Sequence, residues 1–271
     1  MLKSIVDCHT HSYFSADSQM AVRDGVQSAI KNGLGGLIFT DHMDLDYPDP
    51  AMDLSFDFEQ RIRVLNQAQH DFAGKIKILK GLELGFQPHV ALKSAEIVNT
   101  YNFDFVICSV HSVDRKSLGS DGGFYDNKTK NQAYTRYLEE IYESVCAMGN
   151  DFDVVGHIGY ACRYSPYTDP ALKYEDQKNL LDMIFKKIIE NGKGIEINTA
   201  GLARKLGFTH PEYGVIKRYK ELGGQIITIG SDAHSSSSIG SNFEVVIKQL
   251  AEIGFKYVTY FENRQPVFVK I

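Results

Sequence analysis

The feature that most constrains the fold is a pair of short polar motifs at opposite ends of the chain. Each follows an apolar run: the first contains His9 and His11, and the second contains Asp232 and His234. Residues i and i+2 of a β-strand point to the same side, so each motif aims two polar side chains in one direction. The two pairs are readily explained together if the first and last strands are neighbours. The spacing therefore predicts a sheet that closes into a barrel.

Length and composition set the broad class of the protein. The chain has 271 residues, 43% hydrophobic and 23% charged, which is ordinary for a globular protein. Since α/β barrels of this length are commonly one domain, we expect a single domain over residues 1–271. The net charge of -5, with no basic run, argues against a nucleic-acid or membrane partner. No signal peptide, bilayer-spanning stretch or disulfide framework is evident, so we expect a cytoplasmic protein.

Apolar β-branched runs alternate with helical patterns along the whole chain, which is typical of βα units around a parallel sheet. We predict an α/β barrel with seven or eight strands. The predicted strands are Ser4–Cys8, Gly36–Thr40, Ile76–Glu83, Phe105–Ser109, Phe152–Gly156, Gly194–Asn198 and Gln225–Gly230. The predicted helices are Met20–Lys31, Phe58–Phe72, Ala91–Tyr101, Thr129–Met148, Asp176–Glu190, Pro211–Leu222 and Ser241–Ile253. Residues 257–261 and 267–271 are predicted to form a terminal strand or an extended tail.

Polar residues gather where the predicted strands end. A βα barrel carries its active site at the carboxyl ends of its strands. Six of the nine histidines follow predicted strands, whereas His70, His89 and His210 do not. The residues at strand ends are His9, His11, His42, Glu83, His111, His157, Asp232 and His234. This joint pattern predicts an active site at one mouth of the barrel.

A metal centre explains this pattern better than packing does. A single histidine after a strand is commonly a hydrogen-bonding residue, but Glu83 lies between two leucines, where an ionised carboxylate needs a partner or a metal. Histidine and carboxylate ligands suit Zn, Mn or Fe. The ligands outnumber the three or four of one catalytic zinc, so two or three divalent ions are expected. Cys8, between two candidate ligands, is expected to pack rather than coordinate.

The ordered set of motifs resembles the polymerase and histidinol phosphatase (PHP) superfamily. The resemblance runs from residue 7 to residue 234 and rests on His9-x-His11, Thr40-Asp41-His42, Glu83, His111, Gly156-His157 and Ser231-Asp232-Ala233-His234. It implies a distorted (β/α)7 barrel, similar to the TIM barrel, with a trinuclear metal site. One implied ion is held by His9, His11, Glu83 and Asp232. A second is held by Glu83, His111 and His157, and a third by Asp17, His42 and His234. Asp17 stands where many members have histidine, and it also fits an ordinary turn.

Within the superfamily the chain is most similar to the stand-alone histidinol phosphate phosphatases. That resemblance implies a phosphomonoesterase that hydrolyses L-histidinol phosphate to L-histidinol and phosphate, a step of histidine biosynthesis. The nucleophile is expected to be a hydroxide that bridges the two ions linked by Glu83. Glu83, Asp232 and His234 are the predicted catalytic residues. The sequence leaves the proton donor open between Asp232 and a metal-bound water.

Three arginines are candidate ligands for the substrate phosphate, because a guanidinium suits phosphate geometry. Arg163 follows the strand that ends at His157, Arg204 lies in the loop after Asn198, and Arg115 follows His111. Each could instead be a solvated loop charge. Five loop aromatics could stack on an imidazole or pack in their loops: Tyr13, Phe14, Tyr47, Tyr160 and Tyr164. Four acidic residues could meet a substrate ammonium or keep the surface soluble: Asp44, Asp46, Asp49 and Asp53.

Three other functions compete with this hypothesis. A phosphoesterase of the same fold could act on phosphotyrosine, a sugar phosphate or a nucleotide, although the negative charge counts against nucleic acid. A non-catalytic barrel would have lost several ligands, and here every expected position holds one. A zinc amidohydrolase on a similar barrel usually has a bridging lysine or an extra pair of histidines at a strand end, and Lys80 is not at a predicted strand end. The fold alone does not decide among these chemistries.

Overall fold

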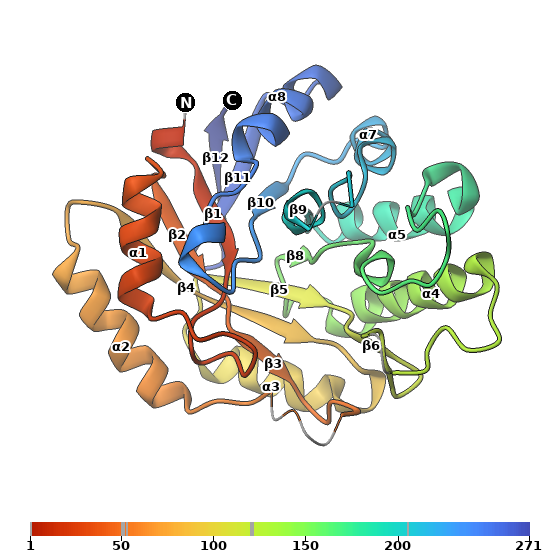
Figure 1. Ribbon diagram of the computed structural model, residues 1–271, viewed down its shortest axis with the longest axis horizontal. Helices are drawn as coiled ribbons and strands as arrows, with labels where there is room; N and C mark the ends of the chain where they lie inside the picture. The colour runs from red at the N-terminus through yellow and green to blue at the C-terminus, as the bar shows by residue number, and fades with distance from the viewer. Residues whose placement is uncertain (1, 50–51, 53, 120–121, 205) are drawn as a thin grey trace.

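A mostly parallel sheet, nearly closed into a barrel, forms the centre of the molecule (Figure 1). The structure is a computed structural model that describes residues 2–49, 52, 54–119, 122–204 and 206–271. The strands follow one another in the order β1 (Val6–Thr10), β2 (Gly36–Phe39), β4 (Lys77–Gly85), β5 (Phe105–Ser109), β8 (Val154–Val155), β9 (Gly194–Asn198) and β10 (Ile227–Gly230). β3 (His42–Asp44) follows β2 and pairs with the last residues of β4. The expected α/β barrel is therefore confirmed.

The first and last strands meet, as the two polar motifs predicted. Thr10 forms a parallel bridge with Ala233, and His11 N donates a hydrogen bond to Ala233 O at 2.9 Å. The buried Asp7 carboxylate accepts from the backbone N–H and the hydroxyl of Ser231, at 2.9 and 2.6 Å. Because Asp7 lies in β1 and Ser231 directly follows β10, these bonds tie the two ends of the barrel together.

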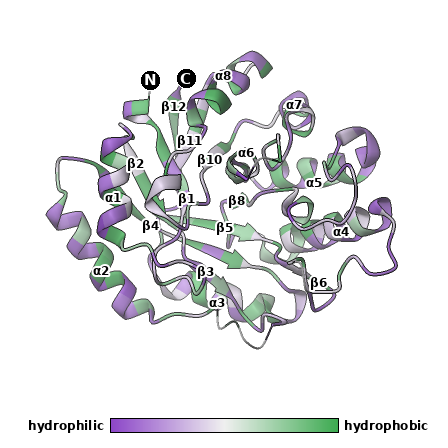
Figure 2. Cartoon of the chain, in the orientation of Figure 1, coloured by the Kyte–Doolittle hydropathy of each residue, from purple (hydrophilic) through white to green (hydrophobic). Residues whose placement is uncertain are grey.

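Helices surround the strands and bury their apolar faces against them (Figure 2). They are α1 (Val22–Lys31), α2 (Phe58–Asp71), α3 (Ala91–Thr100), α4 (Lys130–Met148), α5 (Lys178–Glu190), α6 (Ala200–Ala203), α7 (Tyr213–Glu221) and α8 (Phe243–Ile253). In α8, Phe243, Val246 and Leu250 are buried at helical spacing, and Gly254, with φ of +105°, ends the helix. Among the described residues, no helix combines the length and apolar character that crossing a membrane requires.

Alternate strand residues form two apolar layers. In β2, Leu37 and Phe39 belong to the large core that includes helix residues, whereas Ile38 belongs to a smaller cluster inside the barrel. The buried members of the inner cluster are Val6, Cys8, Ile38, Leu79, Phe105, Ile107, Val154 and Phe261. Cys8 is thus a packing residue, as the sequence predicted.

A C-terminal hairpin closes the amino end of the barrel. It consists of β11 (Tyr257–Glu262) and β12 (Gln265–Lys270), which pair antiparallel. Phe261 stacks on Phe105 in the inner cluster, with ring centroids 5.2 Å apart. Arg264 Nε donates to the Asp153 carboxylate at 2.6 Å. Since Asp153 lies just before β8, the hairpin covers the end of the barrel opposite the polar motifs.

Most predicted elements match the structure, and the differences have local causes. β5 and β9 have the predicted bounds. The first strand begins at Val6 and not Ser4, because residues 2–4 form a 3-10 turn. β8 spans only Val154–Val155, and directly before it the Asp153 side chain accepts the Val106 N–H at 2.8 Å. Residues 257–261 and 267–271, predicted as a strand or an extended tail, fall almost entirely in the two strands of the C-terminal hairpin. A small hairpin of β6 (Ser112–Val113) and β7 (Lys116–Ser117) follows His111.

Candidate metal centre and substrate pocket

The carboxyl ends of the barrel strands bring the predicted ligands to one mouth. Parallel strands share one carboxyl edge, so side chains far apart in the sequence meet there. His9 lies in β1, His42 begins β3, and Glu83 lies in β4. His11, His111, His157, Asp232 and His234 lie in the segments that directly follow β1, β5, β8 and β10.

Glu83 stands at the centre of this cluster and has no exposed surface. One of its carboxylate oxygens, Oε2, lies 3.0 Å from His9 Nε2, 3.3 Å from His11 Nε2 and 2.9 Å from His42 Nδ1. The other, Oε1, lies 2.7 Å from His157 Nε2 and 3.2 Å from His111 Nε2. A single carboxylate therefore contacts five imidazoles. Glu83 thus lies where a carboxylate that bridges two metal ions would be expected.

Two histidines of the cluster face each other through nitrogen atoms. His9 Nε2 and His11 Nε2 are 3.0 Å apart. Their other ring nitrogens already have partners: His9 Nδ1 lies 2.6 Å from Glu196 Oε1, and His11 Nδ1 lies 2.9 Å from Ser15 Oγ. If both Nδ1 atoms donate, both Nε2 lone pairs point into the same space, and a proton or a cation there removes their repulsion.

Buried polar atoms without hydrogen-bond partners mark the same space. Glu83 Oε2 and His42 Nδ1 lie 2.9 Å apart, yet neither has a hydrogen bond among the described residues. The Nδ1 atom of His157 and the Nε2 atom of His234 are also buried without such a partner. Buried acceptors of this kind are unfavourable unless something satisfies them, and a divalent metal ion would do so. The donor set therefore fits the implied metals.

Geometry groups the residues into overlapping sets that could each hold an ion. In every set the potential ligand atoms lie within 4.8 Å of one another. The sets are His9, His11 and Glu83; His9, His157 and Asp232; Glu83, His111 and His157; His11, His42 and His234; and His42, Asp44 and His111. Asp17 is not among them, but its Oδ2 lies 3.0 Å from His234 Nε2 and 3.7 Å from His42 Nε2. All nine predicted metal ligands therefore converge at one mouth.

The cluster perturbs the pKa values of its own members. Burial alone would raise the pKa of Glu83, but His9, His42 and His111 hold it well below its usual value. Burial, together with the neighbouring His234 and His42, lowers the pKa of His11 to about 3. His11 is therefore neutral at physiological pH, which is the state in which an imidazole binds a metal.

Of the three predicted phosphate-binding arginines, Arg163 lies at the cluster. Its buried guanidinium forms a very short ion pair with Asp232 Oδ2 and donates to Asn198 Oδ1 at 3.2 Å. Arg115 is exposed at the pocket described below and pairs with Asp46 at 3.2 Å. Arg204 is exposed at the end of α6. The three predicted positions thus differ in burial and in distance from the metal ligands.

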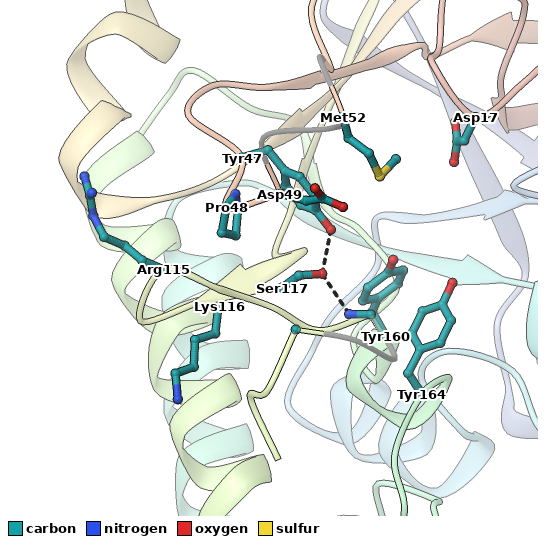
Figure 3. Close-up of a pocket in the computed structure, with 12 residues that line it drawn as sticks. Asp17, Tyr47, Pro48, Asp49, Met52, Arg115, Lys116, Ser117, Tyr160 and Tyr164 are labelled. Carbon is teal, nitrogen blue, oxygen red and sulfur yellow. Dashed lines mark hydrogen bonds between the residues drawn. The ribbon is translucent and has the colours of Figure 1, made fainter. Parts of the chain in front are cut away.

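A cavity of about 570 Å³ opens beside the cluster, within the usual range of roughly 300–1,000 Å³ for small-molecule sites. Figure 3 shows the residues that line it. Tyr160 joins the cavity to the cluster, because its ring centroid lies 4.9 Å from that of His157. The lining mixes aromatic and charged side chains: Asp17, Tyr47, Asp49, Met52, Arg115, Lys116, Ser117, Tyr160 and Tyr164. Tyr47 and Ser117 hold each other through a 2.7 Å hydrogen bond between their hydroxyls. Three of the five predicted aromatics therefore line one cavity.

Asp44 was predicted, with three other acidic residues, to meet a substrate ammonium or to lie at the surface, but the structure places it beside a candidate metal ligand. It is buried, and its Oδ1 lies 2.7 Å from His111 Nδ1, so it orients a candidate ligand rather than meeting solvent. Gly85 makes room for it, because a Cβ at that position would lie 1.9 Å from Asp44 Oδ1. The signal was present in the sequence, since Asp44 follows His42 by two residues. Asp53 lies outside the described residues.

Three further buried residues were missed as parts of the site. Asp41 accepts from Ser15 Oγ at 3.3 Å and from Arg61 Nε at 2.6 Å, and Ser15 in turn contacts His11. No sequence pattern pairs Arg61, near the start of α2, with the barrel. Glu196 could have been found, because it lies between two isoleucines just as Glu83 lies between two leucines.

Comparisons with known proteins agree with this geometry. The PHP domain family matches residues 7–200. The histidinol-phosphatase of Lactococcus lactis subsp. lactis is 34% identical over 230 residues, 84% of each chain. A probable histidinol-phosphatase of Clostridium acetobutylicum is 31% identical over 96% of this chain and 98% of its own. The crystal structure of the L. lactis histidinol phosphate phosphatase, complexed with zinc, L-histidinol and phosphate, superposes with a TM-score of 0.90 and 32% identity, covering 98% of this chain and all of that one.

Proposed function

The chain belongs to the PHP domain family, and from that premise we propose that it is a metal-dependent histidinol-phosphatase, which hydrolyses L-histidinol phosphate to L-histidinol and phosphate. The observation that carries the proposal is the contact of one buried carboxylate, Glu83, with five histidines at the open end of the barrel. Relatives that are named histidinol-phosphatase or probable histidinol-phosphatase match along most of the chain. We assign the whole of residues 1–271 to one domain.

The proposed ligand sets follow the sequence. His9, His11, Glu83 and Asp232 would hold one ion; Glu83, His111 and His157 would hold a second; Asp17, His42 and His234 would hold a third. Divalent metals at such a site lower the pKa of bound water and neutralise charge on phosphoryl oxygens. The hydrolysis of phosphate monoesters is among the slowest uncatalysed reactions, so large electrostatic stabilisation is required.

The chain itself supplies a fixed cation for the substrate phosphate. The Arg163 guanidinium is buried, and Asn198 and Asp232 hold it at the edge of the ligand cluster. A held guanidinium loses less side-chain entropy when it binds a phosphate oxygen than a free surface arginine does. Arg115 and Arg204 are exposed and are weaker candidates for the same role.

Asp232 is better suited to bind a metal ion than to donate a proton. Burial would raise its pKa, but the charges of Arg163 and His9 hold that pKa well below the usual value for an aspartate. An ionised carboxylate has no proton to give to a leaving alkoxide. Of the two proton donors that the sequence left open, this favours a water molecule over Asp232.

The cavity beside the cluster would hold the histidinol part of the substrate. Tyr47, Tyr160 and Tyr164 offer aromatic surfaces for an imidazole ring, and Asp49 offers a carboxylate for an ammonium group (Figure 3). Aromatic contacts of this kind contribute about 0.5–1.5 kcal/mol beyond the area they bury. The related L. lactis enzyme was crystallised with L-histidinol, phosphate and zinc. Manganese and iron as alternative metals, and a cytoplasmic location, stay predictions of the sequence.

The test is phosphate release by the zinc-loaded protein. Histidinol phosphate would be compared with phosphotyrosine, a sugar phosphate and a nucleotide at equal concentrations. The proposal predicts the highest kcat/KM for histidinol phosphate, because the other substrates lack an imidazole beside an ammonium group. Equal values for all four would support a general phosphoesterase, and no turnover of any would refute the catalytic assignment.

A further inference from the structure

One barrel strand at the mouth contributes none of the proposed metal ligands. β9 (Gly194–Asn198) lies between β8 and β10, whose ends carry His157 and Asp232. Its polar residues, Glu196 and Asn198, are two positions apart and so share the face that points to the barrel interior. Both have no exposed surface. Two fully buried polar side chains on this strand require partners, and their partners include His9 of β1, His157 after β8 and Asp232 after β10.

Glu196 contacts two ligand-bearing segments through its two oxygens. Oε1 lies 2.6 Å from His9 Nδ1, on the side of the ring opposite the proposed metal. Oε2 accepts the backbone N–H of His157 at 2.7 Å. Gly230 leaves room for this arrangement, because a Cβ there would lie 2.3 Å from Glu196 Oε1 and 2.4 Å from His9 Cβ. One carboxylate therefore orients His9 and fixes the backbone of His157.

Asn198 extends the same support to a third strand. Its Nδ2 lies 3.3 Å from Asp232 Oδ2 and 3.4 Å from Glu196 Oε2, and its Oδ1 accepts from Arg163. The side chains of β9 thus connect β1, β8 and β10 behind the ligand cluster. A carboxylate that binds the second nitrogen of a metal-ligating histidine fixes the ring's tautomer and raises its basicity as a ligand.

We propose that Glu196 is a positioning residue that sets the metal affinity of this site, by holding the His9 imidazole with its Nε2 lone pair toward Glu83 and by fixing the segment that carries His157. The proposal rests on the metal-dependent function proposed above. Glu196 lies behind its histidines and does not line the substrate cavity. It should therefore act on metal binding and leave substrate recognition unchanged.

The variant Glu196→Gln tests this with little change of shape. His9 Nδ1 and His157 N face different oxygens of Glu196, and an amide has an accepting oxygen at only one of those two positions, so the variant loses one of the two hydrogen bonds. The matched control is Asp153→Asn. Asp153 is also a buried carboxylate that accepts from a backbone N–H, that of Val106 at 2.8 Å, but it lies at the opposite end of the barrel. Each variant removes one buried negative charge. Glu196→Gln removes it next to the candidate metal ligands, whereas Asp153→Asn removes it at the opposite end of the barrel.

The measurement is the dissociation constant for zinc, obtained by competition with a chromophoric chelator after removal of all metal. The circular dichroism spectrum and the melting temperature of each metal-free protein are recorded in parallel, as measures of folding and stability. We expect Glu196→Gln to weaken zinc binding about 10- to 100-fold, the usual effect of losing such a partner. We expect Asp153→Asn to lower the melting temperature without weakening zinc binding. At saturating zinc, the KM of Glu196→Gln for histidinol phosphate should equal that of the unaltered protein.

Zinc affinity of Glu196→Gln equal to that of the unaltered protein would overturn the positioning role while leaving the proposed function intact. A lowered melting temperature with unchanged zinc affinity would assign Glu196 to the barrel's stability and would overturn the role as well. Failure of the unaltered protein to bind zinc would refute the metal-dependent function, and with it this inference.

Discussion

The cluster of candidate metal ligands and the cavity beside it share one mouth of the barrel, but they are built differently. Glu83, His9 and His11 have no exposed surface, and strands or strand ends carry them. The cavity is lined mainly from segments between elements and from the small β6–β7 hairpin, and its side chains are more open to solvent: Tyr164 is 36% exposed and the Arg115 side chain 68%.

The difference separates what the fold fixes from what the loops select. The hydrogen bonds between strands hold the residues of a closed sheet at fixed distances from one another. Such fixed distances suit a metal centre, which requires defined geometry. Exposed loop residues can change without disturbing the barrel, and they suit the recognition of a particular substrate. Changes in the cluster should therefore affect every substrate, whereas changes in the cavity should affect histidinol phosphate selectively.

The largest effect is expected from Glu83→Gln in the cluster. The amide keeps the side-chain volume but removes the charge that joins five histidines, so metal binding and turnover should both fail. Loss of a residue that only supports a metal ligand can lower activity about 100-fold. We expect kcat/KM of Glu83→Gln to fall by more than that, and by a similar factor for every phosphate ester. Phosphate-release kinetics with metal analysis measure this. Substantial turnover by Glu83→Gln would remove that residue from the centre.

The next largest effect is expected from removal of the metals, which should lower the stability of the folded protein. Zinc that binds the folded protein but not the unfolded chain stabilises it by about 3–4 kcal/mol at 100 to 1,000 times its dissociation constant. Chelation should therefore lower the melting temperature of the unaltered protein. The same treatment should hardly change that of Glu83→Gln. Equal shifts in the two proteins would show that zinc acts elsewhere on the chain.

Arg163→Lys tests the boundary between the two regions. The lysine keeps a positive charge near Asp232 but cannot hold Asn198 and a phosphate oxygen together in the way a guanidinium can. Hydrogen bonds to charged groups contribute roughly 1.5–3 kcal/mol, so we expect KM to rise about 10- to 100-fold while metal content stays normal. Arg115→Ala is the control, with a smaller change. Steady-state kinetics that leave the KM of Arg163→Lys unchanged would exclude the arginine from phosphate binding.

The smallest effect is expected from Tyr164→Ala in the cavity wall. The side chain is partly exposed, so its loss should spare both the fold and the metals. We expect KM for histidinol phosphate to rise about 2- to 10-fold, as the loss of one aromatic contact implies. KM for a small phosphate ester without a ring should not change. A parallel rise for both esters would mean that Tyr164 does not select the imidazole.

The sequence predicted the cluster well because alternation along strands decides where side chains point. His9 and His11, or Asp232 and His234, need only their spacing and the order of the strands to be placed at one mouth. Contacts between distant elements had no such signal. Arg61 reaches Asp41 from the start of α2, and Tyr47, in the loop after β3, meets Ser117 of β7. Those contacts exist only once the barrel has closed.

Two residues show where the reasoning from sequence could have gone further. Asp44 was grouped with exposed acidic neighbours, although its position two residues after His42 places it on the same side of β3. Glu196 carries the same signal as Glu83, a carboxylate inside an apolar strand. Both turn out to bind the second nitrogen of a candidate metal ligand. Buried carboxylates at strand ends thus predict either a metal ligand or its immediate support.

The central claim is that Glu83 bridges divalent metals at this mouth of the barrel, and anomalous X-ray diffraction from zinc-loaded crystals tests it most directly. The account predicts zinc peaks within coordination distance of Glu83, at about 2.0–2.2 Å from its oxygens and at similar distances from the nitrogens of His9 and His157. Zinc-loaded crystals that show anomalous peaks only away from Glu83, or none, would contradict it.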